Sequence, residues 1–91
     1  FMDKNKIAIE SLASDLKRIA LLRHRGSIQA ATKFSIEATK RVHEIDASST
    51  QPYIQKILQD IPKALLDSDT ALMHSTLLQN YSLHHYSSAS S

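Results

Sequence analysis

The chain has no cysteine, only one glycine and only two prolines among its 91 residues. Without cysteine it can form no disulfide, no thiolate nucleophile and no zinc or iron–sulfur site held by thiolates. A single glycine excludes the glycine-rich loops that bind phosphate and the G-x-S-x-G elbow of serine hydrolases. Small β-sandwiches and barrels need many glycine- or proline-containing turns. These shortages favour a helical protein.

Aromatic residues are also scarce, with three tyrosines, two phenylalanines and no tryptophan, so we expect an aliphatic core. No apolar run approaches the roughly 20 residues of a membrane span, and we expect no membrane contact and a cytoplasmic location. The length corresponds to one domain. A core of this size leaves a monomer modestly stable, so a protein partner or a second copy would add stability.

The spacing of apolar residues predicts an all-α domain over residues 1–86. We expect a four-helix antiparallel hairpin bundle, or a three-helix one with a kink at Pro62. The predicted helices cover about residues 3–25, 27–45, 51–66 and 68–85, and a disordered serine-rich tail covers residues 87–91. The clearest stripe is in the first helix, at steps of three and four: Ile9, Leu12, Leu16, Ile19 and Leu22.

Residues that favour helix ends mark the boundaries. Asp3 is a suitable cap for the first helix, and Gly26 ends it because glycine takes the left-handed conformation at little cost. Ser27 is a suitable cap for the second helix, and Asp67 begins a cap cluster for the fourth. Pro62 leaves two alternatives, a kinked third helix or a break near Asp60.

Two further stripes predict which helix faces are buried. The second helix carries Ile28, Ala31, Phe34 or Ser35, Ala38, Val42 and Ile45. The last helix carries Leu72, Met73, Thr76, Leu77, Asn80 and Tyr81, which we predict to form its inner face.

Positive charge is concentrated in the first half of the chain. Residues 1–45 hold nine Lys and Arg against five Asp and Glu, whereas residues 46–91 hold two against four. Helical spacing predicts that Lys17, Arg18, His24 and Arg25 share one face. A cluster of cations suits phosphate groups, so the candidate anion- or nucleic-acid-binding residues are Lys17, Arg18, Arg23, Arg25, Lys33, Lys40 and Arg41. The alternative is that these cations bind nothing and belong to a solvated helix end, where they complement the helix dipole.

Neither a metal site nor an active site is predicted. His84 and His85 are adjacent and face about 100° apart on a helix, and His74 lies three turns earlier, so the spacing suits no shared ion. The titratable residues show no convergent set, and we expect no enzyme activity, no cofactor and no small-molecule substrate.

The remaining hypothesis is a non-catalytic interaction or regulatory module that associates with itself as a homodimer or with another protein. Apolar residues that sit partly off the main stripes, or at the end of one, are the candidate interface residues: Ile7, Leu21, Leu22, Leu78 and Leu83. A small basic nucleic-acid- or anion-binding protein is the alternative function.

Overall fold

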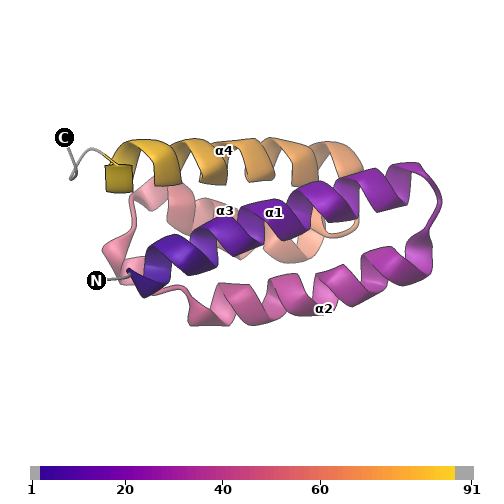
Figure 1. Cartoon of the computed structure of the whole chain (residues 1–91), viewed down its shortest axis with the longest axis horizontal. Helices are drawn as coiled ribbons and strands as arrows, with labels where there is room; N and C mark the ends of the chain where they lie inside the picture. The colour runs from indigo at the N-terminus through magenta and orange to yellow at the C-terminus, as the bar shows by residue number, and fades with distance from the viewer. Residues whose placement is uncertain (1–2, 88–91) are drawn as a thin grey trace.

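The computed structural model describes residues 3–87, and this part of the chain contains four α-helices and no strand. The elements are α1 (Lys4–His24), α2 (Ile28–Glu44), the 3-10 helix η1 (Ala47–Ser49), α3 (Pro52–Ala64) and α4 (Ser68–Ser87). Figure 1 shows two antiparallel hairpins, α1 with α2 and α3 with α4. The predicted all-α hairpin bundle is confirmed.

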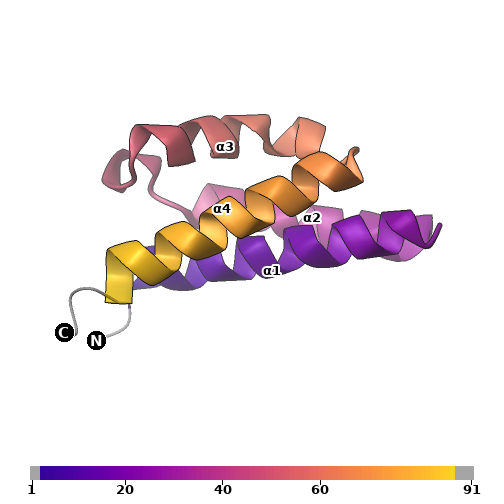
Figure 2. The same cartoon turned by 90° about the horizontal axis from the view of Figure 1, so that it is seen from above.

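Helix α1 is the centre of the bundle. It packs against α2 on one side and against α4 on the other, whereas α3 packs mainly against α4 (Figures 1 and 2). The core is aliphatic, as predicted, and its largest fully buried apolar side chains are Ile9, Leu12, Leu16, Ile19, Ile54, Ile61 and Leu78. The first four are in α1, so the stripe predicted there is confirmed except for Leu22, which is only half-buried.

The corner between α1 and α2 forms around Gly26, whose φ is 83°. The backbone N–H of Ser27 donates to the carbonyl of Leu22 at 2.8 Å, and that of Gly26 donates to Arg23 at 3.0 Å. These two bonds satisfy carbonyls that the end of α1 leaves without a helical partner. Ser27 occupies the N-cap position of α2, but its side chain makes no cap bond, so the predicted capping role of its hydroxyl is wrong.

The segment between α2 and α3 is tied to the start of α1. The Asn5 side-chain amide donates to the Asp46 carbonyl at 3.2 Å, and the Asp46 N–H donates to the Asn5 amide oxygen at 2.8 Å. Hydroxyl donors from Ser48 and Ser49 reach the Asp46 carboxylate and lower its pKa below the usual value. This predicted linker is therefore an ordered turn.

Helix α3 continues through Pro62 and ends at Ala64, two residues before the predicted boundary, so the chain forms four helices and has no break near Asp60. Only two helical residues follow Pro62, so the lost hydrogen bond falls in the last turn, where it costs least. Asp67 caps α4 as predicted, because its carboxylate accepts from the backbone N–H and the hydroxyl of Thr70. Helix α4 includes Ser87; residues 88–91 of the predicted tail lie outside the described part.

Candidate interaction surface

The predicted basic residues do not form one continuous surface. Lys17 lines a groove of about 270 Å³ between α1 and α4, beside Glu10 and Gln79. The guanidinium of Arg18 instead lies over the ring of Phe34 in α2, 5.5 Å from its centroid. The prediction that Lys17 and Arg18 share a face is wrong, because consecutive residues of a helix point about 100° apart.

The cations of α2 lie beside acids of the same helix. Arg41 Nη1 is 3.2 Å from Glu44 Oε1, and Lys40 Nζ is 3.6 Å from Glu37 Oε1. Lys33 borders a hollow that Glu37 also lines. Each of these three cations therefore has a carboxylate nearby, which reduces the net positive field of this helix. Arg23 and Arg25 lie apart from them, at the end of the α1–α2 hairpin.

The seam between α1 and α2 is polar at its middle. Asp15 of α1 is half-buried there, with Arg18, Arg41 and Glu37 as its charged neighbours. Burial raises the pKa of the Asp15 carboxyl, although the two arginines act in the opposite direction. The arginines thus balance a partly buried acid of their own protein, which gives them a structural role.

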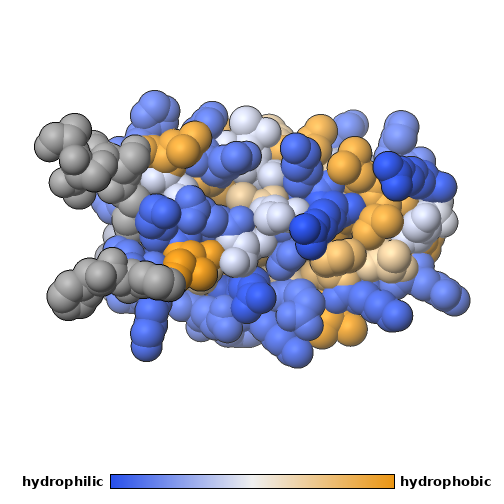
Figure 3. All heavy atoms as spheres, in the orientation of Figure 1, coloured by the Kyte–Doolittle hydropathy of each residue, from blue (hydrophilic) through white to orange (hydrophobic). Residues whose placement is uncertain are grey.

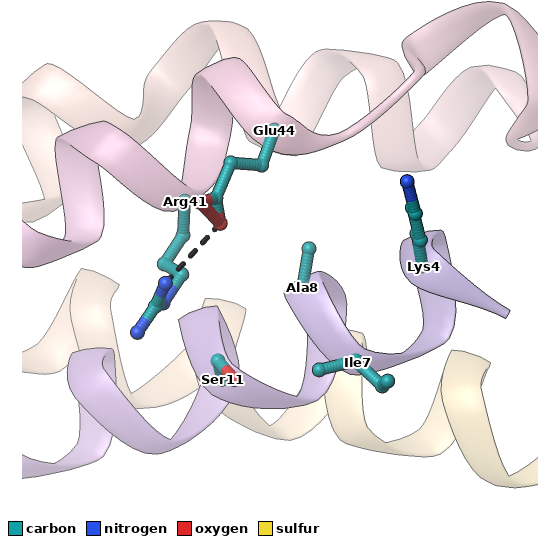
Figure 4. Close-up of a pocket in the computed structure, with 6 residues that line it drawn as sticks. All are labelled: Lys4, Ile7, Ala8, Ser11, Arg41 and Glu44. Atoms are coloured by element: carbon teal, nitrogen blue, oxygen red, sulfur yellow. Dashed lines mark hydrogen bonds and ion pairs between the residues drawn. The ribbon is translucent and has the colours of Figure 1, made fainter. Parts of the chain in front are cut away.

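Figure 4 shows an open groove of about 390 Å³ nearer the start of α1, lined by Lys4, Ile7, Ala8, Ser11, Arg41 and Glu44. The dashed line in it is the Arg41–Glu44 ion pair, and Lys4 lies at the other end of the groove. Cation, acid and apolar side chain alternate along this groove. No set of groups converges on one point, so the groove has no evident catalytic or anion-binding geometry.

The predicted interface residues fall into three classes. Ile7, Leu21 and Leu83 are exposed, the last with 52 % of its surface accessible. Leu22 is partly buried at the end of α1. Leu78 is fully buried in the core, so its prediction as an interface residue is wrong: it lies on the inner face of α4, which the sequence had placed elsewhere.

Helix α4 buries the opposite face from the one predicted. Its buried residues are Ala71, His74, Ser75, Leu78, Tyr81 and Ser82. Of the predicted inner face only Tyr81 is buried, and the exposed members are Leu72, Met73, Thr76, Leu77 and Asn80. The leucines are distributed around the whole helix, so spacing alone identified no unique stripe.

Polar contacts hold the inner face of α4 in place. The Ser75 hydroxyl donates to the carbonyl of Ala13 in α1 at 2.6 Å, within the buried interior. The ring nitrogen Nε2 of His74 lies 2.7 Å from Asp60 Oδ2 of α3. Nearer the end of α4, the Tyr81 ring packs edge-on against Tyr53 and is stacked on His85. The Ser75 bond thus fixes α4 to α1, and the His74 contact fixes it to α3.

The outward face of α4 combines exposed apolar side chains with neutral polar ones. After Asp69, no Asp, Glu, Lys or Arg occurs in the helix, although it continues to Ser87. Exposed apolar residues extend along it: Leu72, Met73, Leu77 and Leu83. Tyr53 of α3 adjoins it, because it lines one hollow with Leu77 and Asn80. Figure 2 shows α4 in front of the other helices along its length. The face in Figure 3 has its apolar groups separated by hydrophilic ones.

Metal binding finds no support in the described part of the chain, where no group of three His, Asp or Glu side chains lies close enough to hold an ion. No described helix is long and apolar enough to cross a membrane. The exposed face of α4 is thus the feature that most needs a functional explanation. Comparisons of the chain with protein-family models, with curated proteins and with solved structures find no match, so this face is interpreted from its chemistry alone.

Proposed function

We propose that this protein is a non-catalytic helical interaction module that associates with a second copy of itself through the outward face of α4. One observation carries the proposal: Met73 and Leu83 are more than half exposed on a helix that has no charged side chain after Asp69. Covering exposed apolar surface with a partner is favourable by about 25 cal/mol for each Å² removed from water. Soluble monomers seldom keep such a face without using it.

The dimensions of the molecule agree with a dimer interface. A standard interface covers about 800 Å² of each partner. The structure measures 42 by 22 by 22 Å, so a whole long side, of which α4 forms a part, has about the required size. Helix α4 runs along this long direction (Figure 1), and burial of its outward face would stabilise both copies. The proposal includes the cytoplasmic location that the sequence favours.

Binding of nucleic acid or another anion is the alternative, and the geometry supports it less. Lys17 and Arg18 point to different sides of α1, and Lys40 and Arg41 lie beside Glu37 and Glu44. Counterion release needs cations that meet phosphates together. A low-salt gel-shift assay with DNA and RNA tests this alternative independently of the mass of the protein.

The proposal is tested by Thr76→Glu, which places a charge at the middle of the outward face. Thr76 is exposed, so the fold should tolerate the change. Two copies that meet through α4 would bring two carboxylates together, and like charges across an interface cost several kcal/mol. We expect the dimer dissociation constant, measured by sedimentation equilibrium over a range of concentrations, to rise about tenfold or more.

The matched control is Thr39→Glu on α2. Thr39 is also exposed, and its hydroxyl donates to the carbonyl four residues earlier, Ser35, just as that of Thr76 donates to Leu72. The control should leave the dissociation constant unchanged. A wild-type protein that remains monomeric at millimolar concentration would refute the proposal, and equal effects of the two substitutions would remove α4 as the interface.

A further inference from the structure

Four exposed residues of α4 lie on one line of the helix. Met73, Thr76, Asn80 and Leu83 follow each other at steps of three, four and three. At 100° per residue these steps keep the side chains together, on the side opposite the buried Leu78. A partner helix that lies along α4 would therefore contact these side chains first. We call them the α4 ridge.

The α4 ridge has the same polarity pattern in both directions. Read from either end it is apolar, polar, polar, apolar, and the midpoint of its numbering falls at Leu78. A two-fold axis requires each surface to complement itself, so that residue i meets residue j and j meets i. An antiparallel pair of such ridges places apolar on apolar and polar on polar.

We propose that α4 pairs antiparallel with α4 of a second copy, with Met73 against Leu83 and Thr76 against Asn80 around a two-fold axis level with Leu78. This register rests on the proposed function, because it describes how the self-association occurs. Leu72 and Leu77 flank the ridge on either side and are exposed as well, so they extend the apolar part of the contact.

The polar centre of the ridge has compatible donors and acceptors. The Thr76 hydroxyl donates its proton to the Leu72 carbonyl at 3.1 Å. Its oxygen is then left to accept, and the side-chain amide of Asn80 in the second copy supplies an N–H donor. The two-fold axis repeats this bond, so both Thr76 hydroxyls and one N–H of each Asn80 amide have a partner in the contact.

Charge favours the antiparallel direction over the parallel one. A parallel pair in register would place Asp69 next to its own copy and align both helix dipoles in the same direction. The antiparallel pair separates the two Asp69 residues and opposes the dipoles. No other formal charge of α4 enters the contact.

The test uses the absence of native cysteine, since each introduced thiol is then the only one in its chain. Met73→Cys and Leu83→Cys are made separately, mixed and oxidised gently. A disulfide requires Cα atoms about 4.4–6.8 Å apart. In the proposed register the two different thiols meet, whereas identical ones lie ten residues apart, about 15 Å along the helix. We expect at least a tenfold excess of the mixed disulfide over either self-linked dimer.

The control is Ile36→Cys, an equally exposed apolar position on α2, which should remain reduced with either partner. Self-linked dimers in each variant alone would overturn the register in favour of a parallel pair. Concentration-dependent mass of the reduced variants without the mixed disulfide would also overturn it, while the self-association itself would stand. Monomeric mass throughout, or a complex only with another protein, would refute both proposals.

Discussion

Helices α2 and α4 flank the same central helix but differ in the kind of surface they present to water. Helix α2 has five charged residues among seventeen, whereas α4 has one among twenty. The buried residues of α2 are small, Ala31 and Ala38, and those of α4 include the polar His74 and Ser75. The comparison shows that hydrophobic content does not identify an inner face. The charged residues of α2 identify its outer face, whereas α4 has too few charged residues to identify its outer face in the same way.

The difference in charge also explains why exposed apolar residues indicate a partner surface on α4 but not on α2. Ile28 and Ile36 of α2 are as exposed as Met73, but Lys33 and Glu37 lie between and beside them. Isolated apolar side chains among charges are ordinary in soluble proteins. On α4 no charge interrupts the series from Leu72 to Leu83, so the same exposure forms a surface suited to a partner.

The largest expected effect separates the two faces of α4 through neighbouring leucines. Leu78→Ala removes a fully buried side chain and should lower the free energy of unfolding by about 2–5 kcal/mol. Leu77→Ala removes an exposed one and should cost less than about 1 kcal/mol in the monomer. Urea unfolding at a fixed low protein concentration measures both. Similar costs for the two substitutions would mean that α4 is oriented differently.

A smaller effect is expected from substitutions at the N-terminal caps of α2 and α4. Asp67→Ala removes the carboxylate that accepts the Thr70 N–H and should cost about 1 kcal/mol of stability. Ser27→Ala should cost only a few tenths of that, because the Ser27 side chain makes no cap bond. Thermal unfolding by circular dichroism is sufficient to rank the two. A larger loss for Ser27→Ala would contradict the observed cap geometry.

The smallest effect concerns the α1–α2 seam, which has a partly buried acid. Burial raises the pKa of the Asp15 carboxyl above its ordinary value of 3.8, so the folded state binds the proton more tightly than the unfolded state does. The contribution of Asp15 to stability is therefore fully present below pH 3.8 and is lost as the pH rises through the folded pKa.

Asp15→Asn should remove this loss and raise the melting temperature slightly at pH 7, with no gain at pH 3. The melting temperature of both proteins measured between these pH values shows the trend. A lower melting temperature for the variant at pH 7 would show that the attraction of Arg18 and Arg41 outweighs the burial of the carboxyl.

Sequence patterns predicted the parts of the fold in which hydrophobicity and charge agree. Ile9, Leu12 and Leu16 have charged neighbours on the opposite face of α1, so their stripe was unambiguous. The apolar residues of α3 that are buried in the core include Ile54 and Ile61. The corner at Gly26 was predictable because glycine alone takes that conformation cheaply.

The face of α4 could not be predicted from apolar spacing, since Leu72, Leu77 and Leu78 point in different directions. Its orientation depends on bonds to distant residues, such as that of His74 to Asp60, which no local pattern contains. Ile28, predicted to be inward, is exposed at the first residue of α2, beyond the contact with α1. The division of Lys17 from Arg18, in contrast, follows from the roughly 100° between consecutive residues of a helix, which the sequence alone supplies. For α4 a signal was nevertheless present: the run without charge after Asp69.

The hydrogen bond from Ser75 to the Ala13 carbonyl has a consequence for the order of assembly. It joins residues 62 positions apart, whereas contacts within each hairpin are local. Closing a long loop costs more entropy than closing a short one, so the hairpins are expected to form before α4 docks on α1. Until that docking occurs, the side of α4 that meets α1 is open to solvent at the same time as its outward face. We therefore expect a stage of folding in which α4, with Asp69 as its one charged residue, exposes the most apolar surface to other chains, and the rate of docking on α1 sets how long this stage lasts.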